Sequence, residues 1–192
     1  GSSSLGPYLV REYVAVGDLR RLVQGDRGVI LHVLAEVADA LQYIHAQGVV
    51  HRDLKPANIL LSDAEPPQIK LADFGLAKLI DSSFVITASN AIMGTIDFLS
   101  PEQLRGRADA RSDRYALGCI IHHLWVGSPP FTGDNFERLH ARLRGTAPSL
   151  AERADDAPSE LVTLTDQLLA SEPAERPDAA HIAAALRAVL LS

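Results

Sequence analysis

Three side chains that could together transfer a phosphoryl group lie in the polar segment 51–58. Asp53 carries a carboxylate, which can orient or deprotonate a hydroxyl group. Lys55 can stabilise charge on a transferred phosphoryl group, and the amide oxygen of Asn58 is a hard ligand that suits magnesium. The segment predicts phosphoryl-transfer chemistry, with an ordinary polar surface loop as the alternative.

A second acidic position follows at a distance that a β-hairpin would close. Asp73 comes fifteen residues after Asn58 and begins the triplet Asp-Phe-Gly. Two short strands are expected, at 58–61 and 68–72, with a turn rich in Ser, Asp and Pro between them. Their pairing would bring Asp73 back beside Asn58, so one magnesium site could use both side chains.

Helices are expected on both sides of this hairpin. From Val29 to Gln47 apolar residues recur at helical spacing, and Gly48 provides a stop past the helix end. Residues 113–126 are apolar nearly all round, as in a central buried helix. The other expected elements are a strand at 8–14, a short helix at 17–23, and helices at 134–144, 159–170 and 178–190. Residues 73–101 show no clear periodicity, which in a compact domain is typical of a functional or disordered segment.

The composition excludes several classes of protein. With 192 residues, 47% of them hydrophobic, the chain can form one globular domain. Its net charge of −6 argues against general nucleic-acid binding, which needs a basic surface. The longest uncharged run, 115–131, is too short and too polar for a membrane span. Cys119 is the single cysteine, and we interpret it as an apolar filler in a buried helix rather than a reactive thiol.

Five motifs in a fixed order resemble the Hanks-type serine/threonine protein kinases, the eukaryotic-like family that bacteria also contain. They are the catalytic loop at 51–58, the magnesium-binding triplet at 73–75, the end of an activation segment at 94–102, the start of the central helix at 113–118, and the late arginine Arg176. The activation segment ends in Ser-Pro-Glu in place of the commoner Ala-Pro-Glu. The resemblance covers residues 5–190 and implies a mainly α-helical fold with a few short β-strands, the large C-terminal lobe of a kinase.

The resemblance implies a role for each catalytic residue. Asp53 would orient the acceptor hydroxyl, and Lys55 would contact the γ-phosphate of ATP. Asn58 and Asp73 would hold Mg²⁺, with Mn²⁺ as an alternative metal. Thr95 would support Asp53 and Lys55 and favour a serine or threonine acceptor.

Further residues would bind the nucleotide or hold the site together. Glu12 and Val14 would offer backbone hydrogen bonds to adenine, with Leu60 under the ring. His51 and Phe74 would stack on one another. The remaining structural positions implied by the resemblance are Arg52, Gly75, Glu102, Asp113 and Arg176, of which Asp113 braces the catalytic loop and Glu102 pairs with Arg176.

The activation segment also suggests regulation. Thr87 and Ser89 precede Thr95 by eight and six residues, which resembles paired autophosphorylation sites of bacterial kinases. Arg52 and Lys78 are the expected partners of an added phosphate. The alternative is a polar loop that is never modified.

The chain departs from the family at its N-terminal side. It contains no Gly-x-Gly and no lysine before Lys55, so we expect the small ATP-clamping lobe to be absent and the isolated chain to be inactive without it. Residues 1–4 are interpreted as a linker or cloning scar, and 5–192 as the hinge strand plus the large lobe. Arg114 stands where an apolar residue is usual, so it should reach the surface or find a carboxylate.

Three functions remain open at this stage. The first is an ATP-dependent kinase that phosphorylates serine and threonine residues of proteins, acts in the cytoplasm and has a parent protein that could carry a membrane anchor. The second is a non-catalytic pseudokinase fragment that serves as a binding module, and the third is a small-molecule phosphotransferase. The Gly-Thr…Pro-Glu segment at 94–102 argues against the third.

Overall fold

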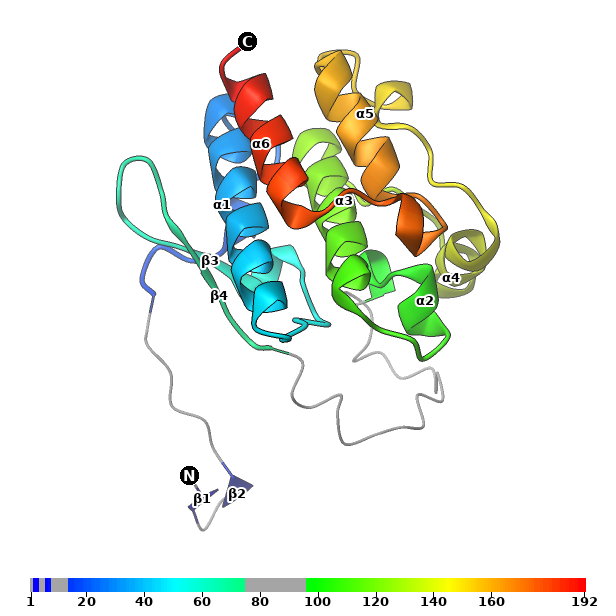
Figure 1. The fold of residues 1–192 in the computed structure, drawn as a ribbon, viewed down its shortest axis with the longest axis horizontal. Helices are drawn as coiled ribbons and strands as arrows, with labels where there is room; N and C mark the ends of the chain where they lie inside the picture. Colours follow the sequence, from blue (N-terminus) through cyan, green and yellow to red (C-terminus); the bar gives the residue numbers. More distant parts are fainter. Residues whose placement is uncertain (1, 4–5, 8–13, 75–95) are drawn as a thin grey trace.

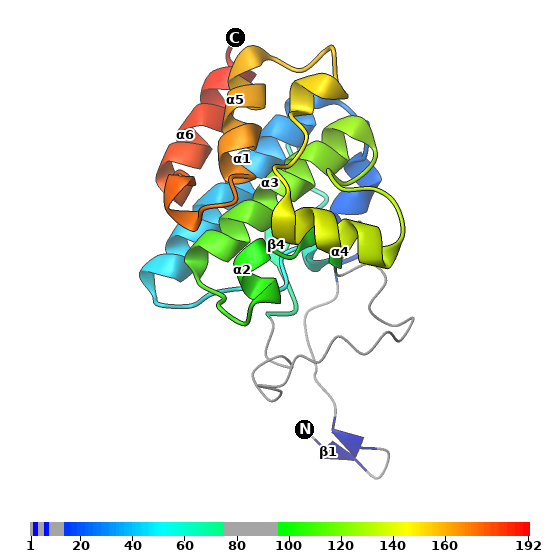
Figure 2. The same ribbon diagram turned by 90° about the vertical axis from the view of Figure 1, so that its right-hand side faces the viewer.

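Four helices packed side by side form the body of the computed structural model, which describes residues 2–3, 6–7, 14–74 and 96–192 (Figures 1 and 2). They are α1 (Arg27–Ala46), α3 (Ala110–Val126), α5 (Ser159–Leu168) and α6 (Ala179–Leu190). α1 packs most extensively against α6, and α3 lies against both α1 and α5. The mainly helical fold expected from the sequence is confirmed.

The helix α1 leads the chain into the catalytic loop. Asp26 caps its N-terminus by accepting a hydrogen bond from the backbone N–H of Val29. Eight of its residues are buried, including Ile30, Leu34 and Leu41. With 20 residues and a mean hydropathy of 1.2, it is the one helix among the described residues long and apolar enough to cross a membrane. Its apolar side chains are accounted for by packing in the core, as in the central helices of other domains.

The central helix α3 begins three residues earlier than expected. Asp109 and Ser112 form a capping box at its start, and Gly127 ends it with a left-handed backbone, φ 89°. Its side chains are buried on almost every face, as the apolar sequence indicated. Cys119 is fully buried, and burial raises the pKa of its thiol to about 12, which agrees with its interpretation as an apolar filler.

Gly118 lets α3 approach the end of α5, and this contact gives a first prediction. A Cβ at position 118 would lie 2.8 Å from the Cβ of Leu168 and 3.1 Å from Leu169. We expect Gly118→Ala to lower the free energy of unfolding by about 1–3 kcal/mol through overpacking, measured by urea denaturation. Gly28→Ala in α1 is the matched control, because its Cβ would meet nothing closer than 3.3 Å. Equal effects of the two substitutions would contradict the close approach.

The remaining elements surround these helices. Two antiparallel strands, β3 (Ile59–Leu61) and β4 (Ile69–Leu71), form the expected hairpin. β1 (Ser2–Ser3) lies within residues 1–4, which were interpreted as a linker or cloning scar, and it pairs with β2 (Gly6–Pro7). The others are α2 (Pro101–Leu104), α4 (Asn135–Arg144), and 3₁₀ turns η1 (Leu19–Leu22), η2 (Pro56–Asn58), η5 (Ile96–Phe98), η6 (Leu150–Glu152) and η7 (Pro173–Glu175).

Two expectations about secondary structure need comment. α2 begins at Pro101, the last residue of the stretch 73–101 that was expected to be irregular, and continues beyond it. It is a single turn, too short to create a periodic pattern, but Ser100 and Gln103 form a capping box that marks its start. Of the strand expected at 8–14, residues 8–13 lie outside the described residues, and Val14 is not in a strand.

Candidate active site

The β3–β4 hairpin brings the end of the catalytic loop beside the Asp-Phe-Gly triplet. Ile59 pairs with Leu71, and the N–H of Ala72 donates to the carbonyl of Asn58 over 2.8 Å. Asp73 is therefore the next residue after the partner of Asn58, as the spacing predicted. Asp73 is exposed and has a left-handed backbone with φ 55°, which is uncommon for a residue other than glycine.

In the catalytic loop, the side chains of Lys55 and Asn58 both contact the carboxylate of Asp53. Lys55 Nζ donates to Asp53 Oδ2 over 2.9 Å. Asn58 Nδ2 donates to the same oxygen over 3.2 Å and to the backbone carbonyl of Asp53 over 2.8 Å. These bonds fix the Asp53 side chain, which is the arrangement that a group receiving or orienting a proton needs. The loop is therefore an ordered cluster rather than a solvated polar loop.

The buried ring of His51 fixes the backbone at the start of the catalytic loop. Its Nε2 lies 3.1 Å from the carbonyl of Ala72 and donates to it, which leaves Nδ1 to accept from the backbone N–H of Asp53 over 3.3 Å. Burial lowers the pKa of His51, despite the nearby Asp113, so the ring is neutral as this pairing requires. The ring also packs on Phe74, with centroids 4.7 Å apart and planes tilted by 30°. The two rings are in contact as expected, but tilted rather than stacked in parallel.

Asp113 of α3 braces the loop backbone. Its carboxylate accepts from the N–H of His51 and the N–H of Arg52, both over 2.9 Å. Arg52 has a left-handed backbone with φ 65°, a conformation that costs energy in a non-glycine residue and that these bonds hold in place. Asp113 also accepts from His45 Nε2 over 2.8 Å. His45 belongs to no motif in the sequence, because its partner lies 68 residues away.

The brace gives a second prediction. Asp113→Asn should lower the free energy of unfolding by about 1–3 kcal/mol, because one of the three donors that face the carboxylate then meets an N–H₂ group and is left unpaired. The measurement is urea denaturation, together with the melting temperature. Asp155→Asn, at an exposed position of the same chain, is the matched control. Unchanged stability of Asp113→Asn would show that the catalytic loop holds its shape without the brace.

Gln103 of α2 ties the segment that follows residue 95 to the catalytic loop. Its Nε2 donates to the carbonyl of Arg52 over 2.9 Å. Its backbone N–H and side-chain oxygen complete the capping box with Ser100. Sequence reasoning missed this contact, although the pattern Ser-x-x-Gln could have located the helix that positions it.

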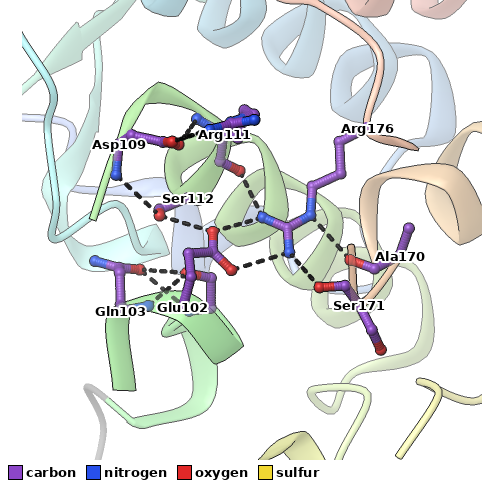
Figure 3. Close-up of polar contacts among 9 residues, drawn as sticks. Glu102, Gln103, Asp109, Arg111, Ser112, Ala170, Ser171 and Arg176 are labelled. Atoms are coloured by element: carbon purple, nitrogen blue, oxygen red, sulfur yellow. Dashed lines mark hydrogen bonds and ion pairs between the residues drawn. The ribbon is translucent and has the colours of Figure 1, made fainter. Parts of the chain in front are cut away.

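Glu102 and Arg176 form a buried ion pair between α2 and the segment before α6 (Figure 3). Arg176 Nη1 donates to Glu102 Oε1 over 2.6 Å, and Nη2 donates to Oε2 over 3.0 Å. Ser112 Oγ adds a bond to Oε1 over 2.8 Å. The remaining donors of Arg176 reach the carbonyls of Arg111, Ala170 and Ser171. The ion pair expected from the resemblance is present, and the polar side-chain atoms of both residues have hydrogen-bond partners.

Arg114 follows only in part the expectation that it reaches the surface or finds a carboxylate. The side chain is half-buried, and its Nε has no hydrogen-bond partner among the described residues. Burial lowers the pKa of its guanidinium, while Asp178, the N-cap of α6, supplies the largest opposing attraction. The arginine thus has a charge partner, but at a distance rather than in contact.

Of the residues expected to contact the adenine ring, the structure describes Val14 and Leu60 but not Glu12. Val14 and Leu60 are half-buried, and Leu60 forms an isolated β-bridge with Asp18. Glu12, Gly75, Thr95 and the two phosphorylation candidates Thr87 and Ser89, with Lys78, lie outside the described residues, so their assignments stay predictions.

The donor set at the hairpin end fits a divalent cation of the magnesium type. An amide oxygen from Asn58 and a carboxylate from Asp73, brought to neighbouring positions by the strand register, are hard oxygen ligands. Within residues 14–74 and 96–192 no group of three or more His, Cys, Asp or Glu side chains gathers as a self-contained metal site. Two ligands with few further protein donors suit Mg²⁺, which usually keeps several waters and substrate phosphates in its shell.

A pocket of about 290 Å³ opens beside Lys55. Its walls come from the catalytic loop, from η5 and from the end of α3 and the loop after it. The lining residues are Arg20, Lys55, Pro56, Ala57, Asp97, Phe98, His123 and Pro129. Because Lys55 contacts both this pocket and Asp53, the pocket adjoins the position of a reacting hydroxyl.

Comparison with known proteins gives a consistent result. The family described as "Protein kinase domain" matches residues 4–186. Serine/threonine-protein kinase PknB of Mycobacterium tuberculosis is 39% identical over 88% of this chain and 28% of its own length. PknL of the same species is 39% identical over 98% of this chain and 48% of its own. PknB of Mycobacterium leprae is 42% identical over 67% of this chain and 21% of its own. The chain thus spans about a fifth to about half of the length of these relatives.

Proposed function

The chain belongs to the protein kinase family, and we propose that its natural protein transfers the γ-phosphate of ATP to serine and threonine hydroxyls of proteins. The observation that carries the proposal is the Asp53 carboxylate, held by Lys55 and Asn58 on a loop that Asp113 braces. The relatives whose sequences match are named serine/threonine kinases, which supports the same acceptor class.

Each residue of the cluster has a task in this reaction. Asp53 accepts a hydrogen bond from the acceptor hydroxyl, aims its oxygen at the phosphorus and takes up its proton. Lys55 lies 2.9 Å from Asp53 and supplies positive charge where the transferred phosphoryl group develops negative charge. Asn58 and Asp73 are proposed to hold Mg²⁺, which neutralises charge on the ATP phosphates.

The pocket beside Lys55 is the proposed place for a side chain of the protein substrate. Its charged lining residues are paired: Arg20 with Asp18 at 2.7 Å, Lys55 with Asp53, and Asp97 with Arg138 at 2.6 Å. The rest of the lining is uncharged: it comes from Pro56, Ala57, Phe98 and Pro129, and from His123, whose pKa is lowered by burial. A neutral side chain near the acceptor residue suits this lining better than a charged one, because an added charge would be partly desolvated without a free partner.

The proposal is tested by incubating the full-length natural protein with labelled ATP, Mg²⁺ and a library of serine, threonine and tyrosine peptides. We expect labelled phosphoserine and phosphothreonine, identified by mass spectrometry, and loss of label when Mg²⁺ is chelated. ATP binding without transfer to any peptide would instead support a pseudokinase that acts as a binding module. We place the reaction in the cytoplasm, where ATP is available.

A further inference from the structure

Arg142 of α4 is almost completely buried, and its guanidinium faces a turn of backbone rather than a carboxylate. It is 1% exposed, the most voluminous fully buried side chain among the described residues. Its Nη1 donates to the carbonyl of Ile96, and its Nη2 donates to the carbonyl of Asp97 over 2.8 Å. The guanidinium also lies 5.0 Å from the centre of the Phe131 ring. Arg142 therefore holds the turn η5 by two consecutive carbonyl groups.

Arg138, one helical turn earlier on α4, holds the same turn by its side chain. Its Nη1 lies 2.6 Å from Asp97 Oδ1, and the two side chains are 15% and 14% exposed. Its Nη2 donates to Asn135 Oδ1 over 2.6 Å, which orients the guanidinium from its own helix. Residues four apart lie on one face of a helix, so the two arginines act on η5 together.

The turn that these arginines hold is a wall of the pocket beside Lys55. Asp97 and Phe98 line the pocket together with Lys55, Pro56 and Ala57 of the catalytic loop. A shift of η5 would therefore change the width of the pocket. Lys55 would stay in place, because its partner Asp53 is held independently by Asn58.

The contacts of Arg138 and Arg142 with η5 suit a role in positioning this turn better than a role in stabilising the fold. Burial raises the pKa of Asp97, and the opposing attractions of Arg138, Arg142 and His123 do not reverse it. The ion pair of Asp97 with Arg138 is therefore weak evidence for added stability, because burial removes hydration from both charges. Apolar side chains of similar volume could fill the space between α4 and η5 at lower cost. What they could not do is grip the backbone carbonyls of residues 96 and 97.

We infer that Arg138 and Arg142 are positioning residues for the protein substrate, which set the η5 wall of the pocket beside Lys55. The inference rests on the proposed kinase function and adds a specific determinant of substrate binding to it. Binding lost equally from the ground state and the transition state raises KM and leaves kcat unchanged. The two arginines should therefore affect KM for the protein substrate, with little effect on kcat or on KM for ATP.

The experiment compares Arg142→Met, Arg142→Lys and Arg138→Gln in the full-length protein, with a serine/threonine peptide that the wild type phosphorylates. We expect KM for the peptide to rise about tenfold for Arg142→Met and about threefold to tenfold for Arg138→Gln, with changes below about twofold in kcat and in KM for ATP. Arg142→Lys should recover part of the loss, because lysine can still donate to a carbonyl. Arg144→Met and Arg144→Gln are the matched controls, on the exposed side of the same helix.

A second measurement follows the turn itself. Amide hydrogen exchange of residues 97–99 should accelerate in Arg142→Met and not in Arg144→Met. Wild-type turnover with an unchanged peptide KM in both Arg138→Gln and Arg142→Met would overturn the inference alone. So would equal rises in KM for peptide and for ATP, which would show a general structural effect. A wild-type protein without turnover would overturn the proposed function and the inference that rests on it.

Discussion

Asp53→Asn is expected to lower kcat by about 10²–10⁴-fold, the contribution typical of a positioned general base. Asparagine keeps the shape of aspartate, and its Oδ1 can still accept from Lys55 or Asn58, so the loop should keep its conformation. What is lost is the negative charge that accepts the proton of the acceptor hydroxyl. KM for ATP should change little, because Asp53 acts on the acceptor.

The measurement is single-turnover phosphorylation of a serine/threonine peptide, with the melting temperature recorded for each variant. Asp63→Asn is the matched control, since Asp63 is an exposed carboxylate in the turn of the β3–β4 hairpin that follows the catalytic loop. A melting temperature near that of the wild type, with a large loss of kcat, would assign the effect to chemistry. An Asp53→Asn variant that retains more than about half of the wild-type kcat would show that proton acceptance by this residue is not needed.

The reaction chemistry could be predicted from the sequence because its residues are close together along the chain. Asp53, Lys55 and Asn58 occupy one short loop, and the strand spacing was enough to place Asp73 beside Asn58. The motifs also indicated the long-range pair of Glu102 and Arg176, but only through resemblance to a family. Spacing alone says nothing of a contact between residues 74 positions apart.

The supporting contacts could not be predicted because they depend on how helices pack. His45 meets Asp113 only because the last turn of α1 lies against the first turn of α3. Helical periodicity predicts which face of a helix a residue lies on, but not which residue of another helix it contacts. From the sequence alone, the arginines of α4 are typical of the charged face of a surface helix. The structure shows that Arg138 and Arg142 instead contact η5. Part of the missing information was present locally: the capping-box pattern at Ser100 would have predicted α2.

Breaking the Glu102–Arg176 pair from one side is expected to have the largest effect on stability. Arg176→Met leaves the Glu102 carboxylate buried with only Ser112 as a partner, and should lower the free energy of unfolding by about 3–5 kcal/mol. For a domain of this size, that corresponds to a fall in melting temperature of about 6–20 °C. Glu102→Gln should cost less, because the amide oxygen can still accept from Arg176. Arg144→Met, at an exposed position, is the control.

The double variant Glu102→Gln/Arg176→Met separates the effect of the ion pair from the effect of the other hydrogen bonds that Arg176 makes. If the cost of Arg176→Met arises from an unpaired buried charge, removing that charge should recover part of it, so the double variant should be more stable than the sum of the two single effects predicts. Additive effects would mean that Arg176 acts mainly through the carbonyls of Arg111, Ala170 and Ser171. Both outcomes are read from the same denaturation curves.

The pair also predicts how stability depends on pH. Burial alone would raise the pKa of Glu102, but the hydrogen bonds from Arg176 and Ser112 lower it below its ordinary value of 4.5. Since the unfolded chain then binds a proton more readily than the folded one, this stabilisation is complete above pH 4.5 and is lost as the pH falls through the folded-state pKa. Wild type should therefore lose stability below about pH 4.5 more steeply than Glu102→Gln, which has no carboxylate to protonate at this position. Parallel pH profiles for the two proteins would show that Glu102 has the same pKa in both states, and that its contacts with Arg176 serve packing rather than charge pairing.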